Sequence, residues 1–461
     1  MFRRILGLAA NSPLAFCSFI SIASTLITSE SSLRAQEAVP SAAADDAFIR
    51  TVENKEAGNV ILQMAIRRFE RTGQTGPVVT MHSAIHIADQ VFYEKLQKLL
   101  DEKDIVLFES VKPPGAGRPE HSLKGADSSE FKIATTKMRL RLLAIAAMAF
   151  ERKNKKLPAD MQELLKSVDG KLELYANLLA KDGWGNDFLY SLLPESEKES
   201  SEKNNTTKSK KLAFEITSLG EDKTQGGEGS AADILLSNQK PISSRDVPKE
   251  GDQGIQADLA EALGLVFQLN AMKHDRANWR NSDLSVDQVQ ERLAASGADG
   301  EELFKMLNGS SMQAGILKLL LGLMKLMPSL QVSGKLMIIE AMGGADQLMS
   351  NMPGANKMME VILKDRNKVV MDDLANIIQR EPAVKHVGII YGGAHMPDLE
   401  ESLEKMGYQE VSVEWLDAIT VVLPKNPAER QQLESMRSTI RKSIEQQAKQ
   451  LQRASAKKKK E

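Results

Sequence analysis

Three short apolar runs, rich in β-branched residues, are spaced along the chain in a pattern that predicts buried strands. Pro77-Val-Val-Thr-Met-His82 is followed by a helical pattern through Leu99, and Asp104-Ile-Val-Leu-Phe-Glu109 comes next. The third run, Val387 to Tyr391, lies far along the chain and leads into Gly392-Gly393. Such runs are typical of parallel strands that are buried on both faces, with a helix as crossover. The sequence therefore predicts an α/β fold around a central sheet.

Each predicted strand is followed closely by a side chain that can bind a metal or transfer a proton. His82 and Glu109 end the first two runs, and His395 follows a predicted positive-φ turn at Gly392-Gly393. Ligands bind beyond the carboxyl ends of the strands in open α/β sheets, so His82, Glu109 and His395 are expected to converge in one pocket. A His–Glu–His set can hold a divalent metal that activates water. Histidines near strand ends are also commonly structural, and that alternative stays open.

Two further side chains could complete such a site. Arg366 lies in Lys364-Asp-Arg-Asn-Lys368 at a predicted helix start, where its guanidinium could stabilise an oxyanion or a substrate carboxylate. His86, one predicted helical turn beyond His82, is a spare ligand. The residues alone thus indicate an oxygen- and nitrogen-liganded metal site with a cation beside it.

The flanking segments give weaker patterns. Residues 36–58 are rich in Ala, Ser and Asp, which predicts a flexible lead-in, and apolar spacing from Val60 to Arg71 predicts a helix. Residues 255–380 carry apolar positions at helical spacing and are expected to form a helical region. Alternation at Glu410–Trp415 predicts the last strand, with an edge strand at Ala418–Leu423.

The sequence pattern changes over residues 130–238, which predict a long helix, a short second helix and then strands with Gly-rich loops. Its motifs stand in order as Leu157-Pro158, Asp182-Gly-Trp-Gly-Asn186, Ser218-Leu-Gly-Glu-Asp222, Gly226-Gly-Glu-Gly229 and Ala232-Asp-Ile234. Together they resemble the soluble head of GspG, the major pseudopilin of type II secretion. The resemblance implies an α+β module and a calcium loop to which Asp222 and Asp233 would contribute, although Ala231 stands where the family often has another acid. A Gly-rich turn without metal is the alternative.

Residues 60–115 and 255–425 together resemble the TraB/GumN family, which is related to the Tiki proteases. The matching residues are Glu109, Arg366-Asn367, Gly392-Gly-Ala-His395 and, with Val79 in place of the family's Gly, Val79-Thr-Met-His82. The resemblance implies a metal-dependent peptidase or hydrolase in which His82, Glu109 and His395 bind the metal and Arg366 assists. The pseudopilin-like block lies between the two halves, so it is expected to be an insertion.

The composition and the first residues of the chain predict where the protein is located and which class of partner it does not bind. The formal charge of −2 argues against an electrostatic nucleic-acid binder. Arg3-Arg4, an apolar run to Ile27 and a cleavage site near Ala35 predict a signal peptide over residues 1–35, with an uncleaved anchor as the alternative. Cleavage would remove Cys17, the only cysteine, so neither a disulfide nor a Cys metal site is expected. The mature chain is expected to be periplasmic or extracellular and to have no membrane span.

Two functions follow from this reading. The first is an exported, metal-dependent hydrolase or peptidase that carries an inserted pseudopilin-like module. The second is a non-enzymatic interaction protein of the cell envelope or of a secretion system, in which the TraB-like half is only a scaffold. A charged C-terminal helix and tail, residues 426–461, belong to neither site.

Overall fold

The computed structural model describes residues 47–73, 75–168, 175–194, 212–242, 247, 255–296, 328–343 and 363–458. The predicted signal peptide lies outside these ranges. The strands are β1 Ile49–Asn54, β2 Asn59–Arg71, β3 Val78–Ala84, β4 Ile87–Ala88, β5 Ile105–Phe108, β6 Leu189–Leu192, β7 Phe214–Ser218, β8 Ile234–Leu235, β9 Val266–Phe267, β10 Trp279–Asn281, β11 His386–Gly392 and β12 Tyr408–Val422. The helices are α3 Gln90–Asp101, α4 Ser129–Asn154, α5 Met161–Lys166, α7 Ala176–Leu179, α9 Ile255–Ala262, α10 Gln268–Ala271, α11 Val286–Ser296, α14 Pro328–Gly343, α17 Asp365–Arg380, α18 Met396–Lys405 and α19 Pro427–Lys458.

A mixed sheet forms the centre of the larger part of the molecule, so the fold is of the predicted α/β class. Its strand order is β1-β2-β3-β11-β5-β10, and β12 pairs along the other edge of β2. The three predicted core strands lie together, with β11 parallel to β3 on one side and to β5 on the other. β10 extends this parallel part beyond β5, whereas β1, β2 and β12 are antiparallel. The carboxyl ends of four parallel strands therefore share one edge.

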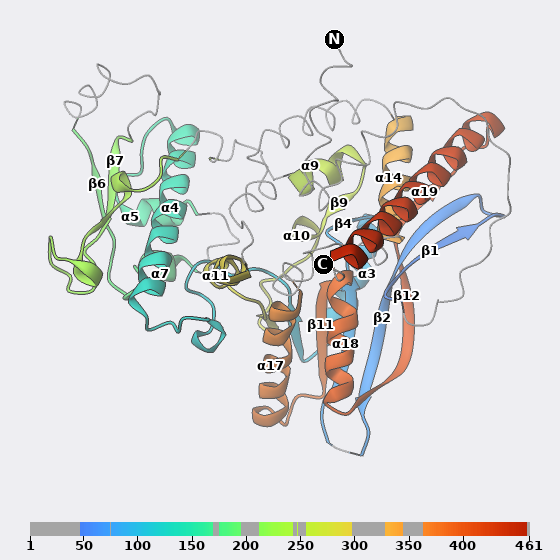
Figure 1. Ribbon diagram of the computed structural model, residues 1–461, viewed down its shortest axis with the longest axis horizontal. Coiled ribbons are helices and arrows are strands. Elements are labelled where there is room, and N and C mark those ends of the chain that lie inside the picture. Colours follow the sequence, from blue (N-terminus) through green and yellow to red (C-terminus); the bar gives the residue numbers. More distant parts are fainter. Residues whose placement is uncertain are drawn as a thin grey trace, which may run out of the picture.

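Helices and loops cover both faces of this sheet and form two apolar clusters. On one face the buried side chains of α3 pack with Ile66, Ile390 and residues of α9 and α14. On the other face, α17 and α18 pack on Met81, Ile389 and Tyr391 (Figure 1). Residues on neighbouring strands that pair in register point to the same face. The face to which a strand residue points therefore determines whether its side chain can reach the candidate site.

The segment Val60–Arg71 is strand β2, so the predicted helix is wrong. Its burial alternates at first, but Met64 and Ala65 are both fully buried because both sheet faces are covered here. The strand pairs with β12 over almost its whole length, from Asn59 to Arg71. Part of the predicted flexible lead-in is also ordered, as strand β1 on the edge of β2. Long-range pairing has overridden the local spacing.

Two other predictions need correction. The expected helical region contains a strand of the central sheet, β10, which pairs with β5. The two strands expected after residue 407 form one strand, β12, with register shifts between Glu410 and Ser412 and between Asp417 and Ile419. Helix α18 begins as predicted, with Pro397 in its first turn. Among the described residues no helix is both long and apolar enough to cross a membrane.

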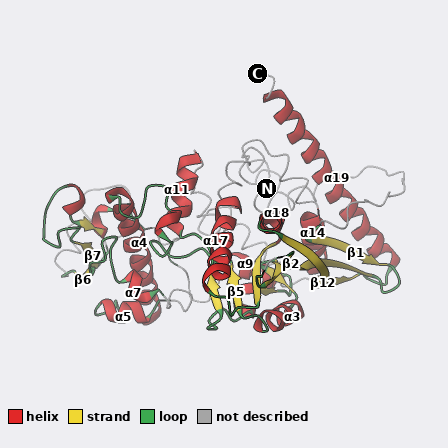
Figure 2. Cartoon of the chain, turned by 90° about the horizontal axis from the view of Figure 1, so that it is seen from below, coloured by secondary structure: helices red, strands yellow, loops and turns green. Residues whose placement is uncertain are grey.

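Residues 129–242 form a second unit with its own apolar core. Helix α4 packs on the antiparallel sheet β6-β7-β8, and Leu140, Leu143 and Ile216 are buried between them. The unit lies at one end of the molecule in both views, opposite β12 and α19 (Figures 1 and 2). Its contact with the rest includes α11, where Asp287 accepts hydrogen bonds from the Thr135 hydroxyl and from the Gly115 backbone N–H. Pro113–Pro119 is rich in Pro and Gly, which predicts a domain boundary, but ordered contacts join the two units here.

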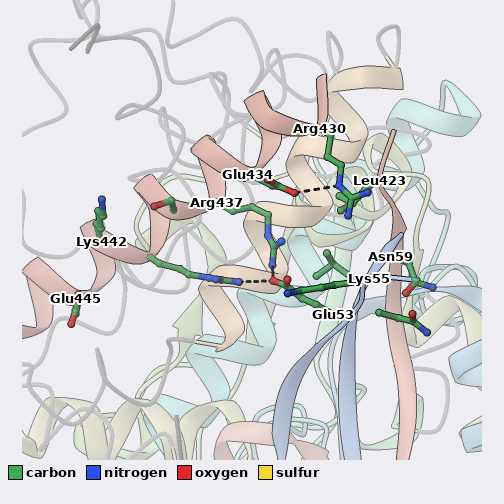
Figure 3. Close-up of a pocket in the computed structure, with 13 residues that line it drawn as sticks. Glu53, Lys55, Asn59, Leu423, Arg430, Glu434, Arg437, Lys442 and Glu445 are labelled. Atoms are coloured by element: carbon green, nitrogen blue, oxygen red, sulfur yellow. Dashed lines mark hydrogen bonds and ion pairs between the residues drawn. The ribbon is translucent and has the colours of Figure 1, made fainter. Parts of the chain in front are cut away.

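Helix α19 is fastened to the sheet by a group of four charged side chains, here called the α19 clamp. Glu340 of α14 and Glu53 of β1 both accept hydrogen bonds from Arg437 and Arg441 of α19. The Glu340 side chain is only 4% exposed, whereas that of Glu53 is 40% exposed. The clamp borders a groove of about 810 Å³ between α19 and the ends of β1, β2 and β12 (Figure 3).

Candidate active site at the strand ends

Two of the predicted site residues lie together where β5 and β11 end. Glu109 directly follows β5, and its Oε2 accepts a hydrogen bond of 2.7 Å from the Gly392 N–H at the end of β11. His395 closes the short 3-10 turn Gly393–His395 that leads into α18. Gly392 has a φ of −56°, so the predicted positive-φ turn is wrong. The need for glycine is one of space, because a Cβ on Gly393 would lie 2.6 Å from Ile49 Cδ1.

Asn367 fixes the orientation of the His395 ring. Its amide nitrogen donates to the His395 carbonyl at 3.1 Å and to the Asp398 carboxylate at 2.9 Å. The amide oxygen is therefore the atom that faces His395 Nδ1, at 2.7 Å. Because that oxygen can only accept, Nδ1 carries the hydrogen in neutral His395 and Nε2 keeps its lone pair. A histidine held in this way presents Nε2 to a metal or to a proton.

Arg366 joins Glu109 to a carboxylate that the sequence analysis missed. Its Nη2 donates to Glu109 Oε1 at 2.7 Å, and its Nε and Nη2 donate to the two oxygens of Asp283 at 2.9 and 2.7 Å. The Asp283 side chain has no exposed surface, and that of Arg366 is 11% exposed. Burial alone would lower the pKa of Arg366, but Asp283 and then Glu109 raise it, so the guanidinium stays charged. Arg366 therefore lies beside Glu109, as the sequence predicted.

Glu109 and His395 each direct one hydrogen-bond acceptor toward the other, Oε1 of Glu109 and Nε2 of His395. His395 Nε2 lies 3.6 Å from Glu109 Oε1. Burial would raise the pKa of Glu109, but Arg366 and then His395 outweigh it and hold the pKa at about 2. Burial lowers the pKa of His395 to about 4, although Glu109 opposes this. At neutral pH the carboxylate is charged and the imidazole neutral, so the pair is suited to hold a water molecule or a cation.

His82 lies elsewhere in the sheet. It is inside β3 rather than at its end, and its register partners are Ile66 and Ile390, both in the cluster on the α3 face. Arg366 and Tyr391 lie on the opposite face. His82 is 1% exposed, and burial, followed by the charge of Lys103, lowers its pKa to about 3. Neither ring nitrogen has a hydrogen-bond partner among the described residues. The structure thus groups Glu109, Arg366 and His395 but does not place His82 in that group.

This buried histidine should make the protein sensitive to acid. Its pKa is about 3 in the folded state against 6.5 ordinarily, so below pH 6.5 the unfolded chain binds a proton that the folded chain does not. The free energy of unfolding then falls by about 1.4 kcal/mol for each pH unit from His82 alone. We expect His82→Leu to remove that contribution. Between pH 7 and pH 5 its free energy of unfolding should fall by about 2 kcal/mol less than that of the wild type.

Urea unfolding at pH 7, 6 and 5 measures this difference. The matched control is His386→Gln, because the His386 side chain is 52% exposed at the start of β11. Its stability should follow the wild-type pH dependence. Equal pH slopes for His82→Leu and the wild type would show that His82 is protonated in the folded protein.

His86 takes the place at the strand ends that was expected for His82. It is exposed in the turn between β3 and β4, not on a helix, and its carbonyl accepts a hydrogen bond from Gln268 at 2.8 Å. Its charge acts on both Glu109 and His395. Ser83-Ala-Ile-His86, like Gly392-Gly-Ala-His395, places a histidine three residues after a small residue near the end of a strand, and the two strands are neighbours. That repeat is the signal that could have singled out His86.

The predicted calcium residues lie in the Gly-rich loop of the second unit. Both Asp222 oxygens accept hydrogen bonds from Thr224, one from its N–H at 3.0 Å and one from its hydroxyl at 2.7 Å. Asp233 Oδ2 accepts from the Gly226 N–H at 3.0 Å. These bonds shape the loop, and the nearby Gly220 carbonyl is held by the Asn186 amide at 2.8 Å. Calcium binding here stays a prediction.

Known proteins give no further guide to the site. Comparisons of the sequence with protein-family profiles and with curated proteins, and of the fold with solved structures, find no match. In the part of the chain that the structure describes, no group of three His, Cys, Asp or Glu side chains is arranged to hold a metal ion. Two of the predicted ligands, Glu109 and His395, lie together. Their separation of 3.6 Å is close to the roughly 3.4 Å between two ligand atoms about 2.1 Å from a tetrahedral zinc.

Proposed function

We propose that the protein is an exported hydrolase, of the kind that its resemblance to the TraB/GumN family implies, with its reacting centre at Glu109 and His395. The observation that carries the proposal is the free Nε2 of His395, fixed by Asn367 and aimed at the charged Glu109 carboxylate. Two acceptors in that arrangement need a water or a cation between them. Arg366, beside Glu109, supplies the positive charge that an oxyanion or a substrate carboxylate requires.

A divalent metal fits this pair of donors in type and in spacing. Glu109 and His395 would hold it, and the exposed His86 is the candidate for a third protein ligand. The bound ion would lower the pKa of a water molecule so that it attacks at neutral pH. Asn367 would keep the His395 ring in the ligating tautomer, and Asp283 would hold the Arg366 guanidinium in its position beside Glu109. A peptide bond is the substrate that the family resemblance implies.

The metal content of the purified mature chain tests this proposal. We expect about one divalent ion per chain, lost in His395→Ala and in Glu109→Gln but kept in His386→Ala, which changes an exposed histidine at the start of β11. Hydrolysis of a fluorogenic peptide library should follow the same order. Equal metal content in all four proteins would contradict a metal site at the strand ends.

A second candidate function is that of a non-enzymatic interaction protein of the envelope or of a secretion apparatus. The observation that favours it is the outer strand of the second unit, β6, where Leu189 and Leu192 are 53% and 50% exposed. Apolar side chains on a sheet edge are typical of a surface that pairs with another chain. If the wild-type protein contains no metal and hydrolyses neither peptides nor esters, the interaction function is favoured over the hydrolase.

A further inference from the structure

A second cavity, of about 260 Å³, lies between the edge strand β10 and helix α17. Leu107 of β5 and Ile377 of α17 give it an apolar wall, and the amides of Asn281 and Asn376 add polar groups. At this volume it is smaller than the usual pocket for a drug-sized ligand, so it suits a compact molecule of a few heavy atoms. It belongs to neither the strand-end site nor the Gly-rich loop.

The cavity is lined by three cations, two of which already have counterions. Arg280 forms two parallel hydrogen bonds with Glu381, at 2.5 and 2.8 Å. Arg118 Nη1 lies 2.8 Å from Asp373 Oδ1, and its Nε lies 3.5 Å from Oε1 of the exposed Glu120. Each of these guanidinium groups thus has at least one carboxylate partner. The third cation of the cavity wall is Lys112.

Lys112 is held firmly but its amine has no partner. Its N–H donates to the Leu284 carbonyl and its carbonyl accepts from the Val286 N–H, both at 2.9 Å, so the backbone is fixed. Within the described ranges, its Nζ makes neither a hydrogen bond nor an ion pair, and the side chain is half-buried in the cavity wall. Burial lowers the pKa of Lys112, and the more distant Asp373 and Asp283 oppose this. A bound anion would supply the missing counterion.

We propose that this cavity binds a small organic monocarboxylate, with its carboxylate on the Lys112 amine and its apolar part against Leu107 and Ile377. Among the described residues, Lys112 is the one cation of the cavity wall without an ion pair, and a single amine matches a single negative charge. The small volume and the apolar wall favour a short-chain acid over phosphate or a larger ligand. The site is independent of the proposed hydrolase activity.

The larger groove beside α19 does not have these features. Its central cations, Arg437 and Arg441, are shared by Glu53 and Glu340 in the clamp, and Figure 3 shows the pairing of Arg437 with Glu53. An anion there would have to displace a buried carboxylate, whereas at Lys112 it would displace none.

Isothermal titration of the mature chain with butyrate tests the proposal, with the uncharged butyramide as the matched ligand. We expect saturable butyrate binding at millimolar concentration, at least about tenfold weaker binding of butyramide, and a similar loss for butyrate in Lys112→Met. Methionine keeps the apolar stem, and the removed amine has no partner, so this variant should fold. Lys98→Met, on the exposed face of α3, should bind butyrate as the wild type does.

A measurement on the unchanged protein guards against a folding defect in the variant. The methyl resonances of Ile377 should shift with butyrate and not with butyramide at equal concentration. Absence of saturable butyrate binding, equal affinity for the two ligands, or undiminished binding by folded Lys112→Met would each overturn the proposal.

Discussion

Arg366→Met should lower the free energy of unfolding by about 3–5 kcal/mol. The substitution keeps most of the side-chain volume but removes the cation between two carboxylates. Asp283, with no exposed side-chain surface, would lose two hydrogen bonds, and Glu109 would lose one. A buried charge that loses its partner costs far more than an exposed one, because water cannot replace the lost contacts. Urea unfolding followed by tryptophan fluorescence, to which Trp279 on β10 contributes, would report this loss.

The matched control is Arg280→Met, because Arg280 also binds a carboxylate with two hydrogen bonds. Its side chain and that of Glu381 are 46% and 36% exposed, so the loss should stay below about 1 kcal/mol. Combining Arg366→Met with Asp283→Leu should recover part of the stability, since the double variant no longer buries that unpaired carboxylate. Equal effects of Arg366→Met and Arg280→Met would show that water reaches the Arg366 pair in solution.

Glu340→Gln should release helix α19, with a loss of about 3 kcal/mol. Glu340 is 4% exposed and accepts from both arginines of the clamp, so its neutralisation leaves Arg437, itself 6% exposed, with Glu53 as its remaining carboxylate. Apart from the clamp, the buried residues in the part of α19 whose side chains are described are Ile440 and Ile444. Limited trypsin digestion should therefore cut within α19 much faster in Glu340→Gln than in the wild type.

Glu53→Gln is the matched control for the clamp. It changes the same chemical group and contacts the same two arginines, but its side chain is 40% exposed. Water can solvate the arginines on that side, so we expect a loss below about 1 kcal/mol and near wild-type digestion. If the two variants were cut at the same rate, burial of Glu340 would not be what holds the helix.

The centre of the fold and half of the site could be predicted from the sequence because their signals are local. An apolar β-branched run such as Val387–Tyr391 is typical of a strand that is buried on both faces, and the polar residue after it marks the strand end. Glu109 and His395 were found by that rule, and Arg366 by its place at a helix start. The same rule placed His82 at a strand end, although β3 continues for two more residues.

What the sequence analysis missed depends on partners far along the chain. Strand β2 resembles a helix in spacing because Met64 and Ala65 are both buried, a result of layers on both faces that no local window contains. Asp283 follows a strand of only three residues, too short to show alternation. That strand exists because it pairs with β5, and the residue that Asp283 binds, Arg366, comes much later still.

The pairing of β5 with β10 has a consequence for the order of folding. Residues 109–278, including the whole second unit, leave the sheet after β5 and return to the same edge at β10, where Lys112 and Ser285 continue the parallel contact. Contacts within the second unit, such as those of β7 with β6 and β8, close shorter segments of chain than the pairing of β10 with β5 does, and contacts of high sequence separation form late. Asp283 and Arg366 are 83 residues apart, whereas Glu109 and Arg366 are 257 apart. We therefore expect Asp283 to bind Arg366 before Glu109 does, so that the Glu109 carboxylate is the last part of the site to reach the arginine.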